Sequence, residues 1–272
     1  MRLEDKDLYM ISPETGKKIL LNPKTGKRKW PTLMEKKNAA RKKKLLPKGN
    51  DKLFKKEEWI PSHEIHSEMK VLTSPVIHTS FDRILEQHKP IQHTAFISMC
   101  TSTRPYYNST KWKRFINEFH HKVDMIVTSN GGIIPEAFWD SWPYLNYESG
   151  EPHGQKETKL YRKLGYDWMI KFFKNHSYKY VICIMNPHHR IYSVWPESLK
   201  ELKEGGYIED YKMIPDIELY ELAQNDGFHG SNPNSAGQMY PELHKFILDV
   251  IIQQVEDFGY DESKFPKTVF DL

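Results

Sequence analysis

The segment Cys100–Ser109 gathers side chains that could carry out chemistry on one short stretch of chain. It holds the thiol of Cys100, the guanidinium of Arg104, the phenol of Tyr106 and the hydroxyl of Ser109. A cysteine beside a basic group can ionise and attack an electrophilic carbon, whereas a packed thiol is inert. Arg104 can hold a phosphate or carboxylate with two hydrogen bonds, and Tyr106 can stack on a base. We expect these four residues to be catalytic.

A second polar segment, residues 128–136, follows another apolar run. Its candidate substrate-binding residues are Thr128, Ser129, Asn130 and Gly131. Paired glycines let a ligand approach the backbone, and an asparagine can read a base edge, but the same residues also suit a plain tight turn. Glu136, which opens the next element, is either a catalytic general acid/base or a favourable charge at a helix start.

A third polar segment, residues 226–235, precedes the last strongly apolar stretch. A histidine among small residues is free to point into a cleft, so His229 is a third catalytic candidate. Ser231 and Asn232 beside it are candidate substrate-binding residues. The alternative is that this segment only supplies turn residues ahead of a helix.

The sequence lacks the motifs of several common classes of site. The chain has two cysteines, too few for a four-cysteine zinc site, and its histidine pairs lack the spacing of a metal-binding helix. It contains no P-loop, no dinucleotide fingerprint and no serine nucleophile elbow. We expect no metal and no cofactor. Cys183 lies in an apolar run and is expected to pack in the core.

The elements that must position these segments alternate between strand and helix. The apolar runs that predict strands are Thr94–Met99, Val123–Thr128 and Tyr180–Met185. The periodic stretches that predict helices are the segment after the N-cap Ser109, residues 156–173 and residues 240–258. The strands are apolar throughout, as expected when helices cover both faces of a parallel sheet. We predict an α/β fold, a three-layer sandwich with a mostly parallel central sheet, over residues 61–272.

Positive charge is concentrated at the front of the chain. Residues 1–60 contain 18 Lys and Arg against 8 Asp and Glu, whereas the 272-residue chain as a whole has a net charge of +4. Two turn-like repeats, at residues 13–18 and 23–28, predict a small hairpin or meander there. The candidate nucleic-acid-binding residues are Lys27, Arg28, Lys29, Arg41, Lys42, Lys43 and Lys44. This basic N-terminal arm either binds a phosphate backbone, anchors an acidic protein or is only a solvated surface.

The remaining composition is that of an ordinary globular protein. No apolar run approaches the roughly 20 residues that span a bilayer, and the first residues lack a signal-peptide apolar region. Scarce cysteines suit a reducing compartment. We expect a cytoplasmic protein without a membrane partner.

The pattern Cys100-x3-Arg104-Pro105-Tyr106-x2-Ser109 resembles the signature of the archaeosine synthase core, Pro-Cys-x3-Lys-Pro-Tyr-x2-Ser-x2-His. The following block, from Val127 to Glu136, is similar to the next sequence block of that family, and the resemblance covers roughly residues 93–260. This sequence departs from the signature at Met99, Arg104 and Trp112, which replace its proline, lysine and histidine. These 272 residues contain no counterpart of the family's transglycosylase-like domain, zinc motif or RNA-binding domain, so we expect a stand-alone catalytic core.

The resemblance implies a transferase that modifies a nucleobase. Archaeosine synthases add an amine, lysine in the known reaction, to the nitrile of 7-cyano-7-deazaguanine in tRNA. Cys100 would then form a thioimidate with the nitrile carbon or line its pocket, while Arg104, Tyr106 and Ser109 would orient the base or the amine. The implied partners are DNA or tRNA and an amine donor such as an amino acid.

A weaker resemblance points to the uracil-DNA glycosylase-like fold. Pro105-Tyr106 and His229-Gly230-Ser231 occur in the order of that fold's two loops, with glycine in place of a proline. It implies hydrolysis of an N-glycosidic bond, in which His229 and Glu136 would matter more than Cys100. A third reading is a module that binds a base without catalysis.

Overall fold

The computed structural model describes residues 9–11, 18–20, 49–60, 62–65, 67–147, 155–189, 191–225 and 244–264. The chain divides into two compact units, Met1–Leu46 and Pro47–Leu272. In the first unit, β1 (Tyr9–Ile11) pairs antiparallel with β2 (Lys18–Leu20), in agreement with the predicted hairpin.

The second unit is built on a five-stranded sheet with the order β5-β4-β3-β6-β7. The strands are β3 (Thr94–Met99), β4 (Asp124–Ser129), β5 (Gly132–Pro135), β6 (Tyr180–Ile184) and β7 (Asp210–Ile214). The central strand β3 runs parallel to β4 and β6, and β6 runs parallel to β7, whereas β5 is antiparallel to β4. The predicted mostly parallel sheet is confirmed.

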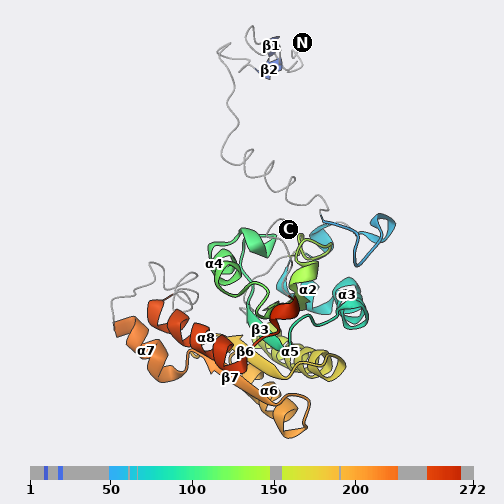
Figure 1. Cartoon of the computed structure of the whole chain (residues 1–272). Helices are drawn as coiled ribbons and strands as arrows, with labels where there is room; N and C mark the ends of the chain where they lie inside the picture. The colour runs from blue at the N-terminus through green and yellow to red at the C-terminus, as the bar shows by residue number, and fades with distance from the viewer. Residues whose placement is uncertain are drawn as a thin grey trace, which may run out of the picture. The chain divides into compact units, whose positions relative to one another are not determined.

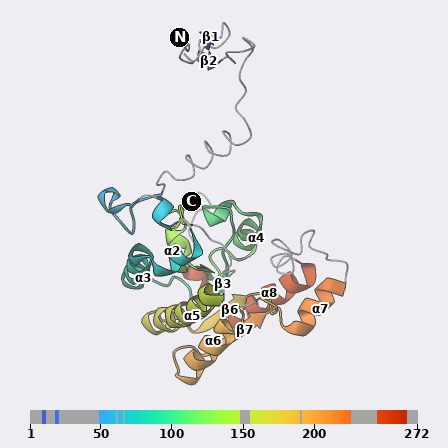
Figure 2. The same ribbon diagram turned by 180° about the vertical axis from the view of Figure 1, so that it is seen from behind.

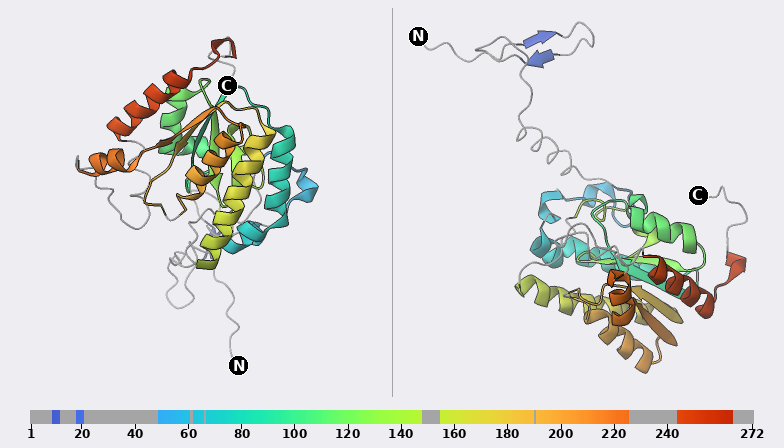
Figure 3. Two further views of the ribbon diagram at one scale, coloured as in Figure 1. Left: turned by 90° about the horizontal axis from the view of Figure 1, so that it is seen from below. Right: turned by 90° about the vertical axis from the view of Figure 1, so that its left-hand side faces the viewer.

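Helices cover both faces of this sheet. Their bounds are α2 (Glu68–Thr73), α3 (Pro75–Gln87), α4 (Thr110–Phe119), α5 (Gln155–Asn175), α6 (Val194–Glu204), α7 (Ile217–Asn225) and α8 (Lys245–Phe258). Short 3-10 turns are η1 (Lys56–Glu58), η2 (Ser62–Ile65), η3 (Tyr106–Asn108), η4 (Glu136–Phe138) and η6 (Glu262–Lys264). Helices α4 and α8 lie on one face of the sheet and α3, α5 and α6 on the other (Figures 1 and 3). Figure 2 shows α5 and α6 side by side. The three-layer α/β sandwich is thereby confirmed.

Local sequence explains how α4 is positioned. Ser109 is its N-cap, and the Ser109 hydroxyl accepts a hydrogen bond from the Trp112 N–H at 3.2 Å, as predicted. The apolar face of α4 packs on the central strand, where the ring of Phe96 lies 5.0 Å from that of Phe115 and 5.3 Å from that of Phe119. The helix start is therefore fixed directly beside the end of β3.

Residues 49–60, which we assigned to the basic arm, instead belong to the second unit. The Asn50 N–H donates to the Asp140 carbonyl at 2.9 Å, and the Asn50 amide donates to the Asp140 carboxylate at 2.7 Å. The Trp59 ring stacks on Trp142 with 5.7 Å between centroids. Apolar burial outweighs the local charge here, so the boundary between the units falls near residue 46 rather than 60.

The segment after β4 differs from the predicted loop. It turns at Gly131 and Gly132 into β5, which pairs back along β4 with Pro135 opposite Ile126. Gly132 has φ of 105°, a conformation that favours glycine. The hairpin therefore returns the chain to the amino-terminal edge of β4.

Two further expectations can be compared with the structure. Cys183 is buried in β6 opposite Ile97, as predicted for a packed core thiol. Within the described ranges, no helix combines the length and the apolar character needed to cross a membrane.

Candidate active site

Cys100 lies at the carboxyl edge of the sheet, directly after the central strand β3. Its N–H donates to the Thr128 carbonyl at 2.9 Å, which extends the β3–β4 pairing by one residue and fixes the Cys100 backbone. The Cys100 residue is partly buried. In parallel sheets this edge, beside helix N-termini, is where ligands bind. The thiol therefore occupies the position that we predicted for a reactive group.

Arg104 is the second charged component of this site. Its guanidinium carbon lies 4.4 Å from the ring centroid of Tyr147 and 5.6 Å from that of Tyr106, and its peptide bond to Pro105 is cis. Its Nε and Nη2 atoms are buried and make no hydrogen bond within the described part of the chain. A guanidinium stays charged in proteins, and leaving buried donors unpaired costs about 1–3 kcal/mol. Arg104 therefore offers donors to a ligand with acceptor atoms.

A chain of buried hydroxyls supports the Arg104 side chain. The Tyr147 hydroxyl lies 2.5 Å from the Tyr106 hydroxyl and 2.6 Å from the Ser129 hydroxyl, and Ser129 also accepts from the Gly131 N–H at 2.9 Å. Burial raises the pKa of both Tyr106 and Tyr147, so both phenols stay neutral. These hydrogen-bonded hydroxyls fix the aromatic rings against which Arg104 lies.

This packing corrects two predictions for the first and second segments. Tyr106 is fully buried, with its ring edge-on to Trp139, so it is not available to stack on a base; Tyr107, 41% exposed, is the accessible aromatic residue of the loop. Gly131 provides space for the Tyr147 ring rather than for a ligand, because a Cβ at Gly131 would lie 3.0 Å from Tyr147 Cζ.

The remaining small polar residues at this edge are buried. Ser109 uses its hydroxyl to cap α4, which is a structural role. Thr128 and Asn130 are 0% and 3% exposed, and the Thr128 Oγ1 makes no hydrogen bond within the described residues. The predicted residues of the first two segments thus converge at the ends of β3 and β4, except for Glu136.

Lys111 is a site residue that our sequence analysis missed. It is only 2% exposed, and its ammonium donates to the Met99 carbonyl at 2.8 Å and to the Ser98 hydroxyl at 3.2 Å. A buried lysine is unusual, and this one lies beside the end of β3. The signal was present: Lys111 precedes Phe115 and Phe119 at intervals of four, on the buried face of α4.

Asn186, two residues after the end of β6, lies at the same edge of the sheet. Asn186 is 5% exposed, its amide donates to the Tyr220 hydroxyl at 3.3 Å, and its carbonyl oxygen accepts from the His188 N–H at 2.8 Å. Sequence reasoning passed over it because a single asparagine after a strand usually only forms a turn.

Electrostatic effects identify the groups that surround the thiol. Charge on Cys100 acts on the pKa of Arg104, Tyr106, Tyr147 and Tyr161. Burial acts to lower the pKa of Arg104, but Tyr106, Tyr147 and Cys100 outweigh it and raise that pKa above its ordinary value. No cluster of three metal-ligating side chains occurs among the described residues. The arrangement suits a nucleophilic thiol beside a fixed cation.

Glu136 lies at the opposite edge of the sheet. Because β5 is antiparallel, Glu136 follows Pro135 to the start of β4, where it shares a cavity with Asp124. The six-residue strand β4 separates that end from Ser129 by roughly 17 Å at ~3.3 Å per residue. The structure does not bring Glu136 to Cys100, which corrects its assignment to this site.

Other predicted residues lie outside the described part of the chain. These are His229, Ser231 and Asn232 of the third segment, and Lys27, Arg28, Lys29, Arg41, Lys42, Lys43 and Lys44 of the basic arm.

Comparisons with known proteins find similarity only to proteins of unknown function. Residues 77–205, which run from the start of α3 to the end of α6, match the family described as a domain of unknown function, DUF5591. A solved structure, the crystal structure of AF0587, a protein of unknown function, is 17% identical with a TM-score of 0.35. That match covers 56% of this chain and 51% of that chain, about half the length of each. No curated protein matches.

Proposed function

We propose that this protein is a nucleobase-modifying transferase that adds an amine donor to the nitrile of a 7-cyano-7-deazaguanine base in DNA or RNA. The observation that carries the proposal is the buried guanidinium of Arg104, with Nε and Nη2 lacking hydrogen bonds, beside the thiol of Cys100. When a nucleophile adds to an acceptor on which negative charge develops, a thiol can supply the nucleophile and a guanidinium can stabilise the charge. The similarity of the Cys100–Ser109 motif to the archaeosine synthase signature supplies the substrate class.

The proposed reaction has two steps. In the first, the Cys100 thiolate forms a C–S bond with the nitrile carbon while the nitrile nitrogen takes up a proton, which gives a thioimidate. In the second, the donor amine attacks the same carbon, the C–S bond breaks, and an amidine is released as Cys100 regains its thiol. No oxidant or reductant is consumed.

The neighbouring groups have distinct roles in this scheme. The Arg104 donors stabilise the charge that develops on the nitrile nitrogen, and the Tyr106–Tyr147–Ser129 series of hydroxyls holds Arg104 in place. Lys111 donates a hydrogen bond to the Met99 carbonyl and so fixes the residue before Cys100. The exposed ring of Tyr107 supplies a surface for base stacking. The basic N-terminal residues supply attraction to the polynucleotide backbone.

In the glycosylase alternative, His229 and Glu136 were expected to matter more than Cys100. Glu136 lies at the other edge of the sheet, so that alternative loses one of its two residues. A module that only binds a base does not need a thiol beside a guanidinium whose Nε and Nη2 lack hydrogen bonds. We therefore retain the transferase as the single proposed function.

The experiment is mass spectrometry of nucleosides from DNA and tRNA of cells that make this protein together with a source of 7-cyano-7-deazaguanine. A new nucleoside, heavier than the nitrile base by one amine donor, is expected with the wild type and absent with Cys100→Ala. Cys183→Ala is the matched control, because Cys183 is a thiol packed in the core. An unchanged nucleoside profile with folded wild-type protein, or full activity of Cys100→Ala, would reject the proposal.

A further inference from the structure

A cavity of about 150 Å³ lies at the amino-terminal edge of β4, away from Cys100. It is lined by residues that follow α3, residues that follow α4, the start of β4 and the turn η4. Its titratable lining residues are His88, Lys89, His120, His121, Asp124 and Glu136. A cavity of this volume can hold a molecule about the size of benzene.

The two carboxylates of the cavity differ in the number of hydrogen bonds that they accept. Asp124 accepts from the N–H groups of Ile91 at 2.8 Å and Gln92 at 3.0 Å, and from the Tyr178 hydroxyl at 2.9 Å. The Glu136 carboxylate makes no hydrogen bond within the described part of the chain, and its side chain is 35% exposed. The Nε2 atom of His120 lies 3.6 Å from Glu136 Oε1, beyond hydrogen-bond length. Glu136 thus has acceptor capacity left for a ligand.

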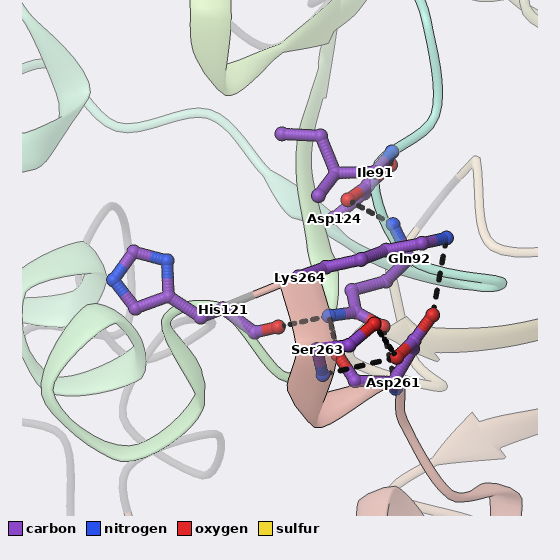
Figure 4. A network of polar contacts seen from close by, with 7 residues as sticks. All are labelled: Ile91, Gln92, His121, Asp124, Asp261, Ser263 and Lys264. Atoms are coloured by element: carbon purple, nitrogen blue, oxygen red, sulfur yellow. Dashed lines mark hydrogen bonds and ion pairs between the residues drawn. The ribbon is translucent and has the colours of Figure 1, made fainter. Parts of the chain in front are cut away.

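A network of polar contacts (Figure 4) holds the part of the cavity wall that contains Gln92, His121 and Asp124. The Gln92 amide donates to the carbonyls of His121 at 2.5 Å and Asp261 at 3.1 Å, and accepts from the Asp261 N–H at 2.9 Å. These bonds hold the backbone of His121, which has φ of 71°, while its imidazole points away from the network (Figure 4). The cavity is therefore preformed rather than assembled by a ligand.

The groups that line the cavity determine the charge near Glu136. Burial lowers the pKa of His120 and His121 and brings that of His88 to about 4, so all three imidazoles are neutral near pH 7. Burial, with a contribution from Asp124, raises the pKa of Glu136 to about 7. Lys89 is the ammonium among the lining residues. A bound cation would favour the ionised carboxylate, and a neutral imidazole offers a second acceptor.

We infer that this cavity binds a small organic monocation, a primary ammonium, which donates hydrogen bonds to the carboxylate of Glu136 and to the imidazole of His120. The site is distinct from the one proposed for catalysis, since the length of β4 separates them. The bound ammonium is therefore not the amine that would react at Cys100. It would act as an effector or a stabilising ligand.

Propylammonium is a suitable probe for the full-length protein, with propan-1-ol as the neutral control and propionate as the anionic one. Binding is measured by chemical-shift titration and by the rise in unfolding temperature, in the millimolar range expected for four non-hydrogen atoms. A group of pKa about 7 is ionised to about 9% at pH 6 and about 91% at pH 8, so affinity should be about tenfold higher at pH 8. The probe itself stays protonated over this range.

Variants of Glu136 test whether propylammonium binds in this cavity. Glu136→Gln should weaken propylammonium at least tenfold, Glu136→Asp should weaken it less, and Glu118→Gln, an exposed site on α4, should bind as wild type. The unliganded unfolding temperature of each variant verifies that it folds. Equal binding of propan-1-ol, no saturation at pH 8, or unchanged affinity in Glu136→Gln would overturn the inference. Cys100→Ala should bind normally, so failure of the proposed function leaves this test intact.

Discussion

The hydroxyl chain beneath Arg104 leads to a quantitative prediction for Tyr147→Phe. The change keeps the ring that carries Arg104 and removes only the hydroxyl that joins Tyr106 to Ser129. Tyr106 is fully buried and Tyr147 supplies its hydroxyl's hydrogen-bond partner, so the Tyr106 hydroxyl would be orphaned at a cost of about 1–3 kcal/mol. Ser129 would keep the Gly131 N–H as a donor. We expect Tyr147→Phe to lower the free energy of unfolding by about 2 kcal/mol and Tm by roughly 4–8 °C.

The companion variant makes the test specific to this chain of hydroxyls. Tyr106→Phe leaves the Tyr147 hydroxyl bonded to Ser129, so its expected cost is only about 1 kcal/mol. In the double variant the orphaned Tyr106 hydroxyl no longer exists. Its total cost should therefore fall below the sum of the two single costs by about 1 kcal/mol, a coupling typical of residues in contact.

Urea denaturation, followed by fluorescence and by circular dichroism, measures the free energy of unfolding of all four proteins. Coincident transitions and a constant m-value are needed for the cycle to be valid. Strict additivity of the two changes, or a Tyr147→Phe cost below about 0.5 kcal/mol, would refute the argument that these hydroxyls form one buried chain.

Three further predictions concern the edge of the sheet that carries Cys100. Ser109→Ala should lower stability by about 1 kcal/mol and Ser109→Asp should restore most of it, as measured by urea denaturation, because only the cap is changed. Arg104→Gln should slow alkylation of Cys100 by iodoacetamide at pH 7 about tenfold, as followed by mass spectrometry, since it removes a positive charge that interacts with the Cys100 sulfur; an unchanged rate would contradict this. Lys111→Met should reduce formation of the modified nucleoside, whereas the exposed Lys113→Met on the same helix should not, as measured by nucleoside mass spectrometry.

Much of the scaffold followed from local sequence. Continuously apolar runs identified β3, β4 and β6, and the serine before a 3.6-residue apolar period identified the start of α4. These features are local because hydrophobic periodicity and capping depend on residues a few positions apart. They were sufficient to place Cys100 at the end of a central strand, next to a helix N-terminus.

The sequence by itself therefore determined the α/β class and the position of the thiol. Tertiary structure decided which side chains accompany Cys100: the partner of Tyr106 lies 41 residues away, and Lys111 is buried only because α4 packs on β3. It also placed Glu136 at the opposite edge of the sheet, because the turn at Gly131 and Gly132 makes β5 antiparallel to β4. Strand order and register arise from contacts between distant segments, so no local pattern in a single sequence specifies them.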